Sequence, residues 1–508
     1  MSKRALSSLS LPSTRTALRA AAIVVSALPG LTQDKALDIR ECEIFDGLVE
    51  RWEGAVEDMG VPGCSIAVVM DGQLYACGAF GIRNPAGDPV DADTMFYIAS
   101  CTKTFTAGAL ARLAEQGRVD LDSKVQKYLP RFKLADEQAS ASITVRDLLC
   151  HRPGINSFPI VFLDAYTGQI TEDRFYHWLS QTEPLGQVTY TNVHFTLAGR
   201  VLEAITGEHW KDALGEQLFV PAGMLRTTAY ASRMYSDKNV AFPMEKDGDG
   251  RFVACSTRKS DQTMHAAGGT GTTARDGARW LLVQLRDGEI DGTKVFSPRT
   301  ARAMRTYESK STPRGATPSL DGFGLGWMLG TYRGRPFVTH GGGYVGTAAH
   351  LSFLPEEGLG VVVLANGSPS GSLFGDLVSM DIYDRLLGED GAEDMLPAFI
   401  DRIARVEPNE RQPDDLVASN QLTLEPADYA GLYSNEHWGD LTLSLGDGNL
   451  TATIGQLSLA MQASGQDRFV GRTSAGGEYA GTFILEKGRV ARVVLAGDGE
   501  PLEFGRVE

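Results

Sequence analysis

Strand-like hydrophobic alternation occurs at both ends of the first 390 residues, and helical spacing fills the region between them. Residues 63–81 form two β-rich runs around Asp71-Gly72, a two-residue turn signal that predicts a hairpin. Apolar residues at helical spacing predict helices over 102–115 and 192–206. The strand period then returns in closely spaced runs at 323–332, 336–340, 346–353 and 359–366. Strands joined by such tight turns are antiparallel neighbours, so we expect an α+β domain whose sheet gathers the first hairpin and the last strands.

The remainder of the chain has a different pattern. Residues 389–422 are rich in Glu, Asp, Pro, Asn and Gln and interrupt the apolar spacing, which indicates a helix-containing linker. Residues 423–508 form short alternating runs with turns at regular intervals, which is typical of a small antiparallel barrel or sandwich. The predicted domains are therefore a leader at 1–33, an α+β domain at 34–388, the linker, and an all-β domain at 423–508.

The predicted leader has the features of an export signal. Four basic residues precede a short apolar run at 20–25, small residues follow this run, and the first acidic residue is Asp34. An amphipathic transit peptide or a plain tail is the alternative. The run is too short to span a bilayer as a helix, and the sequence has no longer apolar stretch of membrane-spanning length. We expect an exported protein, periplasmic or extracellular, without a membrane span.

Charge and cysteine usage narrow the possible functions. The chain carries 64 acidic and 48 basic residues, which argues against a nucleic-acid partner because phosphate binding needs a basic face. The six cysteines are scattered, with no C-x-x-C pair and no histidine at zinc spacing, so we expect buried thiols rather than disulfides or a metal site. The sequence has no phosphate-binding loop or dinucleotide fingerprint, and no cofactor is implied.

Two Ser-x-x-Lys tetrapeptides occur, Ser100–Lys103 and Ser256–Lys259, and about two are expected by chance in a chain of this length. Ser256 lies in a polar stretch without helical spacing, which indicates a solvated loop. Ser100 ends an extended segment and begins the helix over 102–115, where unpaired N–H groups and the helix dipole stabilise a developing negative charge. Lys103 follows one turn later, and burial would lower its pKa until its amine can accept the Ser100 proton. A capping serine followed by a solvated lysine is the alternative.

Two further motifs carry groups suited to acyl transfer. Tyr190-Thr-Asn192 precedes a helix, and a phenol can relay a proton to a leaving group while an asparagine amide holds a substrate carbonyl. His340-Gly-Gly-Gly343 ends a predicted strand, where glycines allow a substrate backbone to approach closely. The N–H of Gly343 could then face the N–H of Ser100 to form an oxyanion hole. Taken alone, these motifs also fit a capped loop and a glycine-rich turn.

Together and in this order, the three motifs resemble those of class C β-lactamases, D,D-peptidases and related esterases. The resemblance covers about residues 40–385 and includes the turn Leu148-Leu-Cys-His-Arg-Pro-Gly154 and the helix entry Gly268-Gly-Thr-Gly-Thr-Thr273. Residues 429–508 resemble a small β-barrel that is appended to some members. The resemblance implies a β-lactamase-like fold, with an antiparallel sheet flanked by helices and an all-helical subdomain.

The resemblance also implies a role for each motif. Ser100 attacks and is acylated, while Lys103 and Tyr190 share the proton transfers. Asn192 orients the substrate amide. The glycines Gly342 and Gly343 belong to the substrate-binding and oxyanion region.

His340 occupies the position where β-lactamases usually carry a lysine. A histidine is mostly neutral at pH 7, so it provides a weaker anchor than lysine for a substrate carboxylate. Gly341, where a hydroxyl residue is usual, removes another carboxylate contact. Esterase and peptide-amidase members commonly have this arrangement.

We therefore expect a serine hydrolase that acts through an acyl-enzyme on an ester, a peptide containing a D-residue, or a related amide. A D,D-carboxypeptidase or β-lactamase is the alternative among enzymes. A non-catalytic sensor or scaffold that kept the fold is the alternative of another class. The expected partner is a small molecule or peptide, and the C-terminal barrel is a candidate for oligomerisation or for covering the active site.

Overall fold

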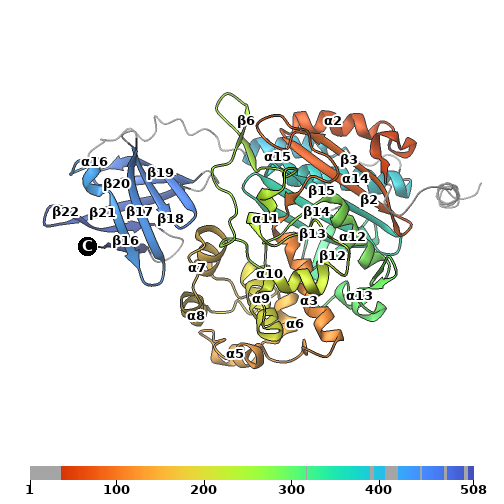
Figure 1. Ribbon diagram of the computed structural model, residues 1–508, viewed down its shortest axis with the longest axis horizontal. Helices are drawn as coiled ribbons and strands as arrows, with labels where there is room; N and C mark the ends of the chain where they lie inside the picture. The colour runs from red at the N-terminus through yellow and green to blue at the C-terminus, as the bar shows by residue number, and fades with distance from the viewer. Residues whose placement is uncertain are drawn as a thin grey trace, which may run out of the picture.

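The computed structural model describes residues 36–315, 317–389, 394–406, 422–446, 449–473, 478–496 and 501–507. The predicted leader lies outside these residues. Figure 1 shows a larger body, in which helices lie against a sheet, and a β-barrel beside its helical end.

An almost entirely antiparallel sheet forms the centre of the larger body. In the described residues its strand order is β1-β3-β2-β15-β14-β13-β12-β11-β10, and only β1 runs parallel to its neighbour. In that order the strands are β1 (Leu37–Asp38), β3 (Gln73–Gly81), β2 (Gly63–Met70), β15 (Leu359–Ala365), β14 (Thr347–Leu354), β13 (Arg335–Tyr344), β12 (Met328–Tyr332), β11 (Ser319–Phe323) and β10 (Ser309–Arg314). The hairpin turns at Asp71 and Gly72, whose φ values of 52° and 71° suit a two-residue loop. Since β15 pairs with β2, the sheet joins the first hairpin to the last strands, and this prediction is confirmed.

Helices cover both faces of the sheet. α2 (Leu48–Asp58), α14 (Ser370–Leu387) and α15 (Leu396–Val406) pack on one face. α12 (Ala274–Leu285) lies on the other, and α3 (Thr102–Glu115) belongs to the same hydrophobic core. Because α15 buries its Ile403 against this body, the helix in the predicted linker is part of the larger body.

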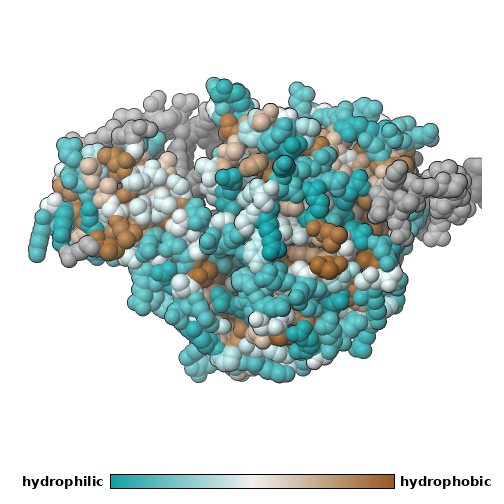
Figure 2. Space-filling view, viewed as in Figure 1, coloured by the Kyte–Doolittle hydropathy of each residue, from teal (hydrophilic) through white to brown (hydrophobic). Residues whose placement is uncertain are grey.

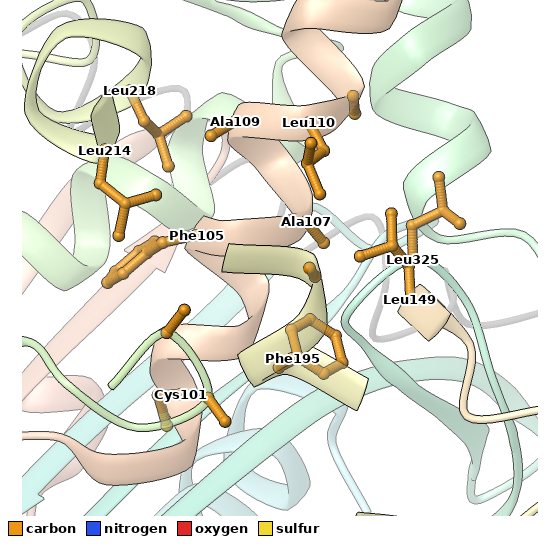
Figure 3. Packing of buried hydrophobic residues seen from close by; sticks show 14 of the residues in the cluster. Cys101, Phe105, Ala107, Ala109, Leu110, Leu149, Phe195, Leu214, Leu218 and Leu325 are labelled. Atoms are coloured by element: carbon orange, nitrogen blue, oxygen red, sulfur yellow. The ribbon is translucent and has the colours of Figure 1, made fainter. Parts of the chain in front are cut away.

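A helical subdomain stands beside the sheet and provides the second wall around α3. It consists of α4 (Val125–Tyr128), α5 (Glu137–Ser142), α6 (Val145–Leu149), α7 (Phe158–Val161), the π-helix η4 (Phe162–Thr167), α8 (Glu172–Ser180), α9 (Asn192–Thr206), α10 (Trp210–Leu214) and η5 (Gly215–Phe219). Figure 3 shows α3 between Leu214 and Leu218 on one side and Leu149 and Leu325 on the other. These contacts fix the helix that follows Ser100, and the expected β-lactamase-like α+β fold is confirmed.

Short elements connect these layers. They are η1 (Ile39–Glu41), η2 (Glu43–Phe45), β4 (Phe96–Tyr97), η3 (Ala99–Cys101), α11 (Ala231–Ser236), β5 (Met244–Lys246), β6 (Phe252–Ala254), β7 (Gly271–Thr272), β8 (Glu289–Ile290), β9 (Thr293–Lys294) and α13 (Pro298–Met304). α6 begins after Thr144, whose side chain forms a capping box with Asp147. All six cysteines are buried free thiols, as expected.

Two strand predictions differ from the structure. The run 323–332 is divided between β11 and β12, because the chain turns at Gly326 with φ 77°. The run at 336–340 does not end at His340, since β13 continues to Tyr344. The glycines that suggested a strand end or a turn are therefore extended strand residues.

The C-terminal part is a closed eight-stranded barrel in the described residues, which decides between the predicted barrel and sandwich. It begins with α16 (Pro426–Tyr429) and continues with β16 (Gly431–Asn435), β17 (Gly439–Gly446), β18 (Asn449–Ile454), β19 (Leu457–Gly465), β20 (Arg468–Thr473), β21 (Glu478–Glu486), β22 (Arg489–Leu495) and β23 (Leu502–Arg506). Alternating residues fill its interior, as in β17, where Leu441 and Leu443 are buried and their neighbours are exposed.

The barrel packs on the helical subdomain through an aromatic contact. Trp438 lies 6.2 Å from the ring of Phe162 and 4.7 Å from that of Trp178. The Trp178 indole N–H donates to the carbonyl of His437 at 3.0 Å. Phe162 belongs to η4, whose other aromatic residue, Tyr166, faces the sheet, so η4 links the barrel to the larger body.

The visible surface is mostly hydrophilic. Figure 2 shows hydrophobic residues on this face in small separate patches rather than in one continuous area. Among the described residues, no helix is long and apolar enough to cross a membrane.

Candidate active site

Ser100 lies where the sheet, α3 and the helical subdomain meet. It is the middle residue of η3, which leads directly into α3. The preceding residue, Ala99, has φ 44°, a left-handed conformation that costs a non-glycine residue about 1–2 kcal/mol. This sharp turn after β4 leaves the Ser100 side chain half-buried, at the start of a helix whose first N–H groups favour negative charge.

Lys103 is fully buried and contacts the nucleophile directly. Its Nζ lies 2.9 Å from Ser100 Oγ, 2.8 Å from Asn192 Oδ1 and 2.7 Å from the carbonyl oxygen of Ala267. Burial lowers the pKa of this amine well below its usual value, and no carboxylate contacts it among the described residues. A neutral amine donates its two hydrogens to the two carbonyl oxygens. Its lone pair then faces the Ser100 hydroxyl, which is the arrangement a base requires.

Tyr190 approaches the same hydroxyl from the helical subdomain. The Lys103 Nζ lies 4.8 Å from the centre of its ring, and the Ser100 side chain is near enough to its phenol to oppose part of the rise in the phenol's pKa. Burial raises the pKa of Tyr190, so the phenol stays protonated and can give a proton to a leaving group.

His340 completes this side of the site but is uncharged. The ring is buried on β13, and its centre lies 6.0 Å from that of Tyr190. Burial and the nearby Lys103 lower the pKa of His340 to about 3. Its Nδ1 donates to the Gly341 carbonyl at 2.7 Å, which leaves Nε2 without a proton. His340 therefore offers no cation to a substrate at neutral pH.

The glycines of β13 let the strand approach the nucleophile. A Cβ on Gly342 would lie 2.1 Å from the Ile98 carbonyl oxygen and 3.1 Å from the Ser100 nitrogen, so no side chain fits there. A Cβ on Gly343 would have no contact closer than 3.9 Å. β12 pairs with β13 only as far as Thr339, so the following residues have a strand partner only in β14. Of the two predicted oxyanion glycines, only Gly342 is sterically required.

Sequence reasoning missed a pair of buried histidines behind Tyr190. The Nδ1 atoms of His151 and His194 lie 3.0 Å apart, with the two rings tilted by 47°, and the centre of the His151 ring lies 4.7 Å from that of Tyr190. The Thr191 N–H donates to His151 Nδ1 at 3.3 Å, which holds the segment between Tyr190 and Asn192. His194 gave no signal in the sequence, because a single histidine on an apolar helix face has no distinctive spacing.

The second Ser-x-x-Lys lies only partly in the solvated loop that was expected. Ser256 is exposed, as the polar loop predicted, but Lys259 is buried and donates to the Ala165 carbonyl at 2.5 Å. Burial lowers the pKa of Lys259 to about 7. Its amine lies 4.0 Å from the centre of the Tyr344 ring, two residues beyond Gly342 on β13. Lys259 thus forms part of a neighbouring aromatic wall.

No group of three or more His, Cys, Asp or Glu residues that could hold a metal ion occurs in the described part of the chain.

The sequence matches the family model named Beta-lactamase over residues 48–380, which is well over half of the chain. The chain belongs to the beta-lactamase family. Like the proteins it matches in this family, it is a hydrolase.

This beta-lactamase-family protein is similar to one curated protein and two solved structures that cover most of its chain. It is 28% identical over 354 residues to penicillin-binding protein 4 of Amycolatopsis lactamdurans, covering 67% of this chain and 88% of that protein. A D-stereospecific amidohydrolase from Streptomyces sp. has 26% identity and a TM-score of 0.53, covering 67% of this chain and 97% of that one. The octameric penicillin-binding protein homologue from Pyrococcus abyssi has 23% identity and a TM-score of 0.58, covering 91% of this chain and 99% of that one. The last match covers 91% of this chain, a share too large to leave out the C-terminal barrel, so it supports a fold of two parts.

Proposed function

We propose that this protein hydrolyses amides or esters of D-amino acids through an acyl-enzyme on Ser100. Lys103 takes the Ser100 proton as Oγ bonds to the substrate carbonyl carbon. The carbonyl oxygen gains negative charge, and the N–H groups of Ser100 and Gly343 stabilise it. The C–N or C–O bond then breaks, and Tyr190 delivers a proton to the leaving group while it receives the proton that Lys103 took from Ser100. Water releases the acyl group by the reverse proton path.

The protonation state of Lys103 carries this proposal. Two carbonyl acceptors, from Asn192 and Ala267, bind the hydrogens of a neutral amine. The Nζ atom, which carries the remaining lone pair, lies 2.9 Å from Ser100 Oγ. A structural ammonium would instead be expected beside a carboxylate, and none contacts it in the described residues.

The uncharged site favours a substrate without a carboxylate beside the scissile bond. His340 stands in place of a lysine and is neutral, so a terminal carboxylate would have no cation to bind there. The similarity to a D-stereospecific amidohydrolase and to a D-amino acid amidase from Ochrobactrum anthropi supports D-amino-acid amides as the substrate class. A penicillin-binding or β-lactam-hydrolysing activity is the second candidate, favoured by the similarity to penicillin-binding protein 4.

A labelling experiment followed by a substrate panel tests the proposal. We expect a fluorophosphonate to add one covalent group at Ser100, detected by intact mass. Ser100→Ala should abolish labelling, and Ser256→Ala, the matched change in the other Ser-x-x-Lys, should retain it. D-amino-acid amides and p-nitrophenyl esters should be hydrolysed faster than L-amides and a chromogenic β-lactam. Labelling that persists in Ser100→Ala would refute the mechanism, and preferential hydrolysis of the β-lactam would select the second candidate.

A further inference from the structure

A second cavity lies behind the loop that holds Lys103. It has a volume of about 500 Å³, a size that suits a small ligand rather than a single water. It is bounded by η4, α9, α10 and the loop 261–266, and we call it the side pocket. Ser100 and Lys103 do not line it. Its polar lining includes Asp164, Thr196, Arg200, Lys211 and His265.

A buried histidine in the side pocket lacks a partner. His265 has a side chain that is 7% exposed, and its Nδ1 makes no hydrogen bond to any described residue. Asp164 Oδ2 lies 3.9 Å from this nitrogen, which is too far for a hydrogen bond. A ligand N–H group beside this gap could sit about 2.8 Å from both atoms, an ordinary hydrogen-bond length. Burial lowers the pKa of His265, so the ring is neutral, and in the tautomer that carries its proton on Nε2 the unpartnered Nδ1 can accept.

Asp164 is a buried acid that no Lys or Arg of the described residues contacts directly, although the more distant Arg200, Lys259 and Lys211 oppose the rise in its pKa. Its carboxylate accepts a hydrogen bond from the Thr196 hydroxyl at 3.0 Å, and burial raises its pKa. The nearby amine of Lys211 donates to the Asp261 carbonyl instead, at 2.5 Å. A buried carboxylate is costly without a charged partner, and a ligand ammonium would provide one.

Arg200 offers the opposite charge in the same cavity. Its guanidinium stacks on the Phe175 ring, with 3.9 Å between its carbon and the ring centre. It makes no hydrogen bond or ion pair within the described residues, so its donors are available to a carboxylate, the anion that guanidinium binds with two parallel bonds.

We propose that the side pocket binds a small zwitterion, namely a free amino acid. The ligand ammonium lies between Asp164 and His265, and the ligand carboxylate lies on Arg200. The choice of an amino acid rests on the proposed function, because hydrolysis of an amino-acid amide releases one. A ligand bound there contacts the loop whose Ala267 carbonyl holds Lys103.

Calorimetric titration of protein with a blocked catalytic site tests this proposal. The full chain is first labelled at Ser100 with a fluorophosphonate and then titrated with glycine, D-alanine and L-alanine. If Ser100 does not label, the proposed function fails, and the titration is made on Ser100→Ala protein, which tests the pocket independently. Methylamine and acetate serve as ligands that carry only one of the two charges.

We expect one amino acid to bind per chain, and methylamine and acetate to bind at least about tenfold more weakly. Asp164→Asn and Arg200→Gln should each weaken amino-acid binding about tenfold or more. Arg200 is only half-buried, so its variant tests the site if Asp164→Asn fails to fold. Asp173→Asn, a matched change of an exposed acid on α8, should bind like the wild type. No binding, equal binding of methylamine, or unchanged affinity in Arg200→Gln would overturn the proposal.

Discussion

Replacing Lys103 with methionine should separate stability from activity. Methionine has a similar length and is apolar, so it occupies the space of the lysine stem without its amine. The base is lost, and we expect kcat/KM to fall by about 10²–10⁴. The effect on unfolding free energy should depend on pH in a way that reports the protonation state of the wild-type amine.

The sign follows from the buried amine. In the unfolded chain Lys103 has its ordinary pKa, near 10.5, whereas burial lowers its pKa in the folded protein. Between these two values the unfolded chain binds one more proton, so the unfolding free energy rises with pH. The slope for one group is about 1.4 kcal/mol per pH unit. From about pH 8 to about pH 9.5, the wild type should therefore gain about 2 kcal/mol relative to Lys103→Met.

Urea unfolding at several pH values in this range, followed by tryptophan fluorescence, measures the difference. Other groups titrate equally in both proteins and cancel. Lys238→Met, a matched change at an exposed lysine, should keep the wild-type slope, since its amine is in water in both states. Parallel stability curves for the wild type and Lys103→Met would show that Lys103 remains an ammonium when folded. The proposed base would then be refuted.

Three other changes test parts of the fold and site. Gly342→Ala places a Cβ 2.1 Å from the Ile98 carbonyl oxygen and should reduce kcat at least about 100-fold, whereas Gly341→Ala, with no contact closer than 3.9 Å, should stay within a few-fold in the same assay. Trp438→Ala should cost about 3 kcal/mol at the barrel contact and split thermal unfolding into two calorimetric transitions; a single unshifted transition would contradict this role. Because the pKa of His340 is lowered to about 3, this ring should not titrate between about pH 5 and 8. The pH–rate profiles of the wild type and of His340→Gln should therefore have the same shape in this range, and an inflection that is lost in the variant would contradict a neutral His340.

Helices and hairpins could be predicted from the sequence because residues close together in the chain determine them. The predicted helix at 192–206 matches α9, since an apolar face and a terminal glycine define it without help from the rest of the chain. The continuation of β13 through three glycines could not be predicted in this way. Those residues lack side chains that favour a strand, and only pairing with β14 keeps them extended.

In the site, too, contacts between residues close in the sequence could be predicted, whereas contacts made by the tertiary fold could not. Ser100 and Lys103 are one helical turn apart, so their contact follows from sequence spacing. The Ala267 carbonyl that fixes the lysine is a backbone atom, and any residue type could supply it. The burial of Lys259 depends on tertiary contacts with Tyr344, which its polar neighbours in the sequence conceal.

The amine of Lys103 can serve as a base only while three separate parts of the fold hold it in position. Ser100 belongs to η3, Asn192 to the first turn of α9, and Ala267 to a loop that Thr106 of α3 anchors through the neighbouring Ala266 carbonyl at 2.7 Å. Loss of either carbonyl acceptor would leave an N–H unpaired in a buried space, which costs about 1–3 kcal/mol. The amine would then turn away from the hydroxyl or recruit water and regain its proton. Activity should therefore be more sensitive than stability to any change that moves α9 relative to α3.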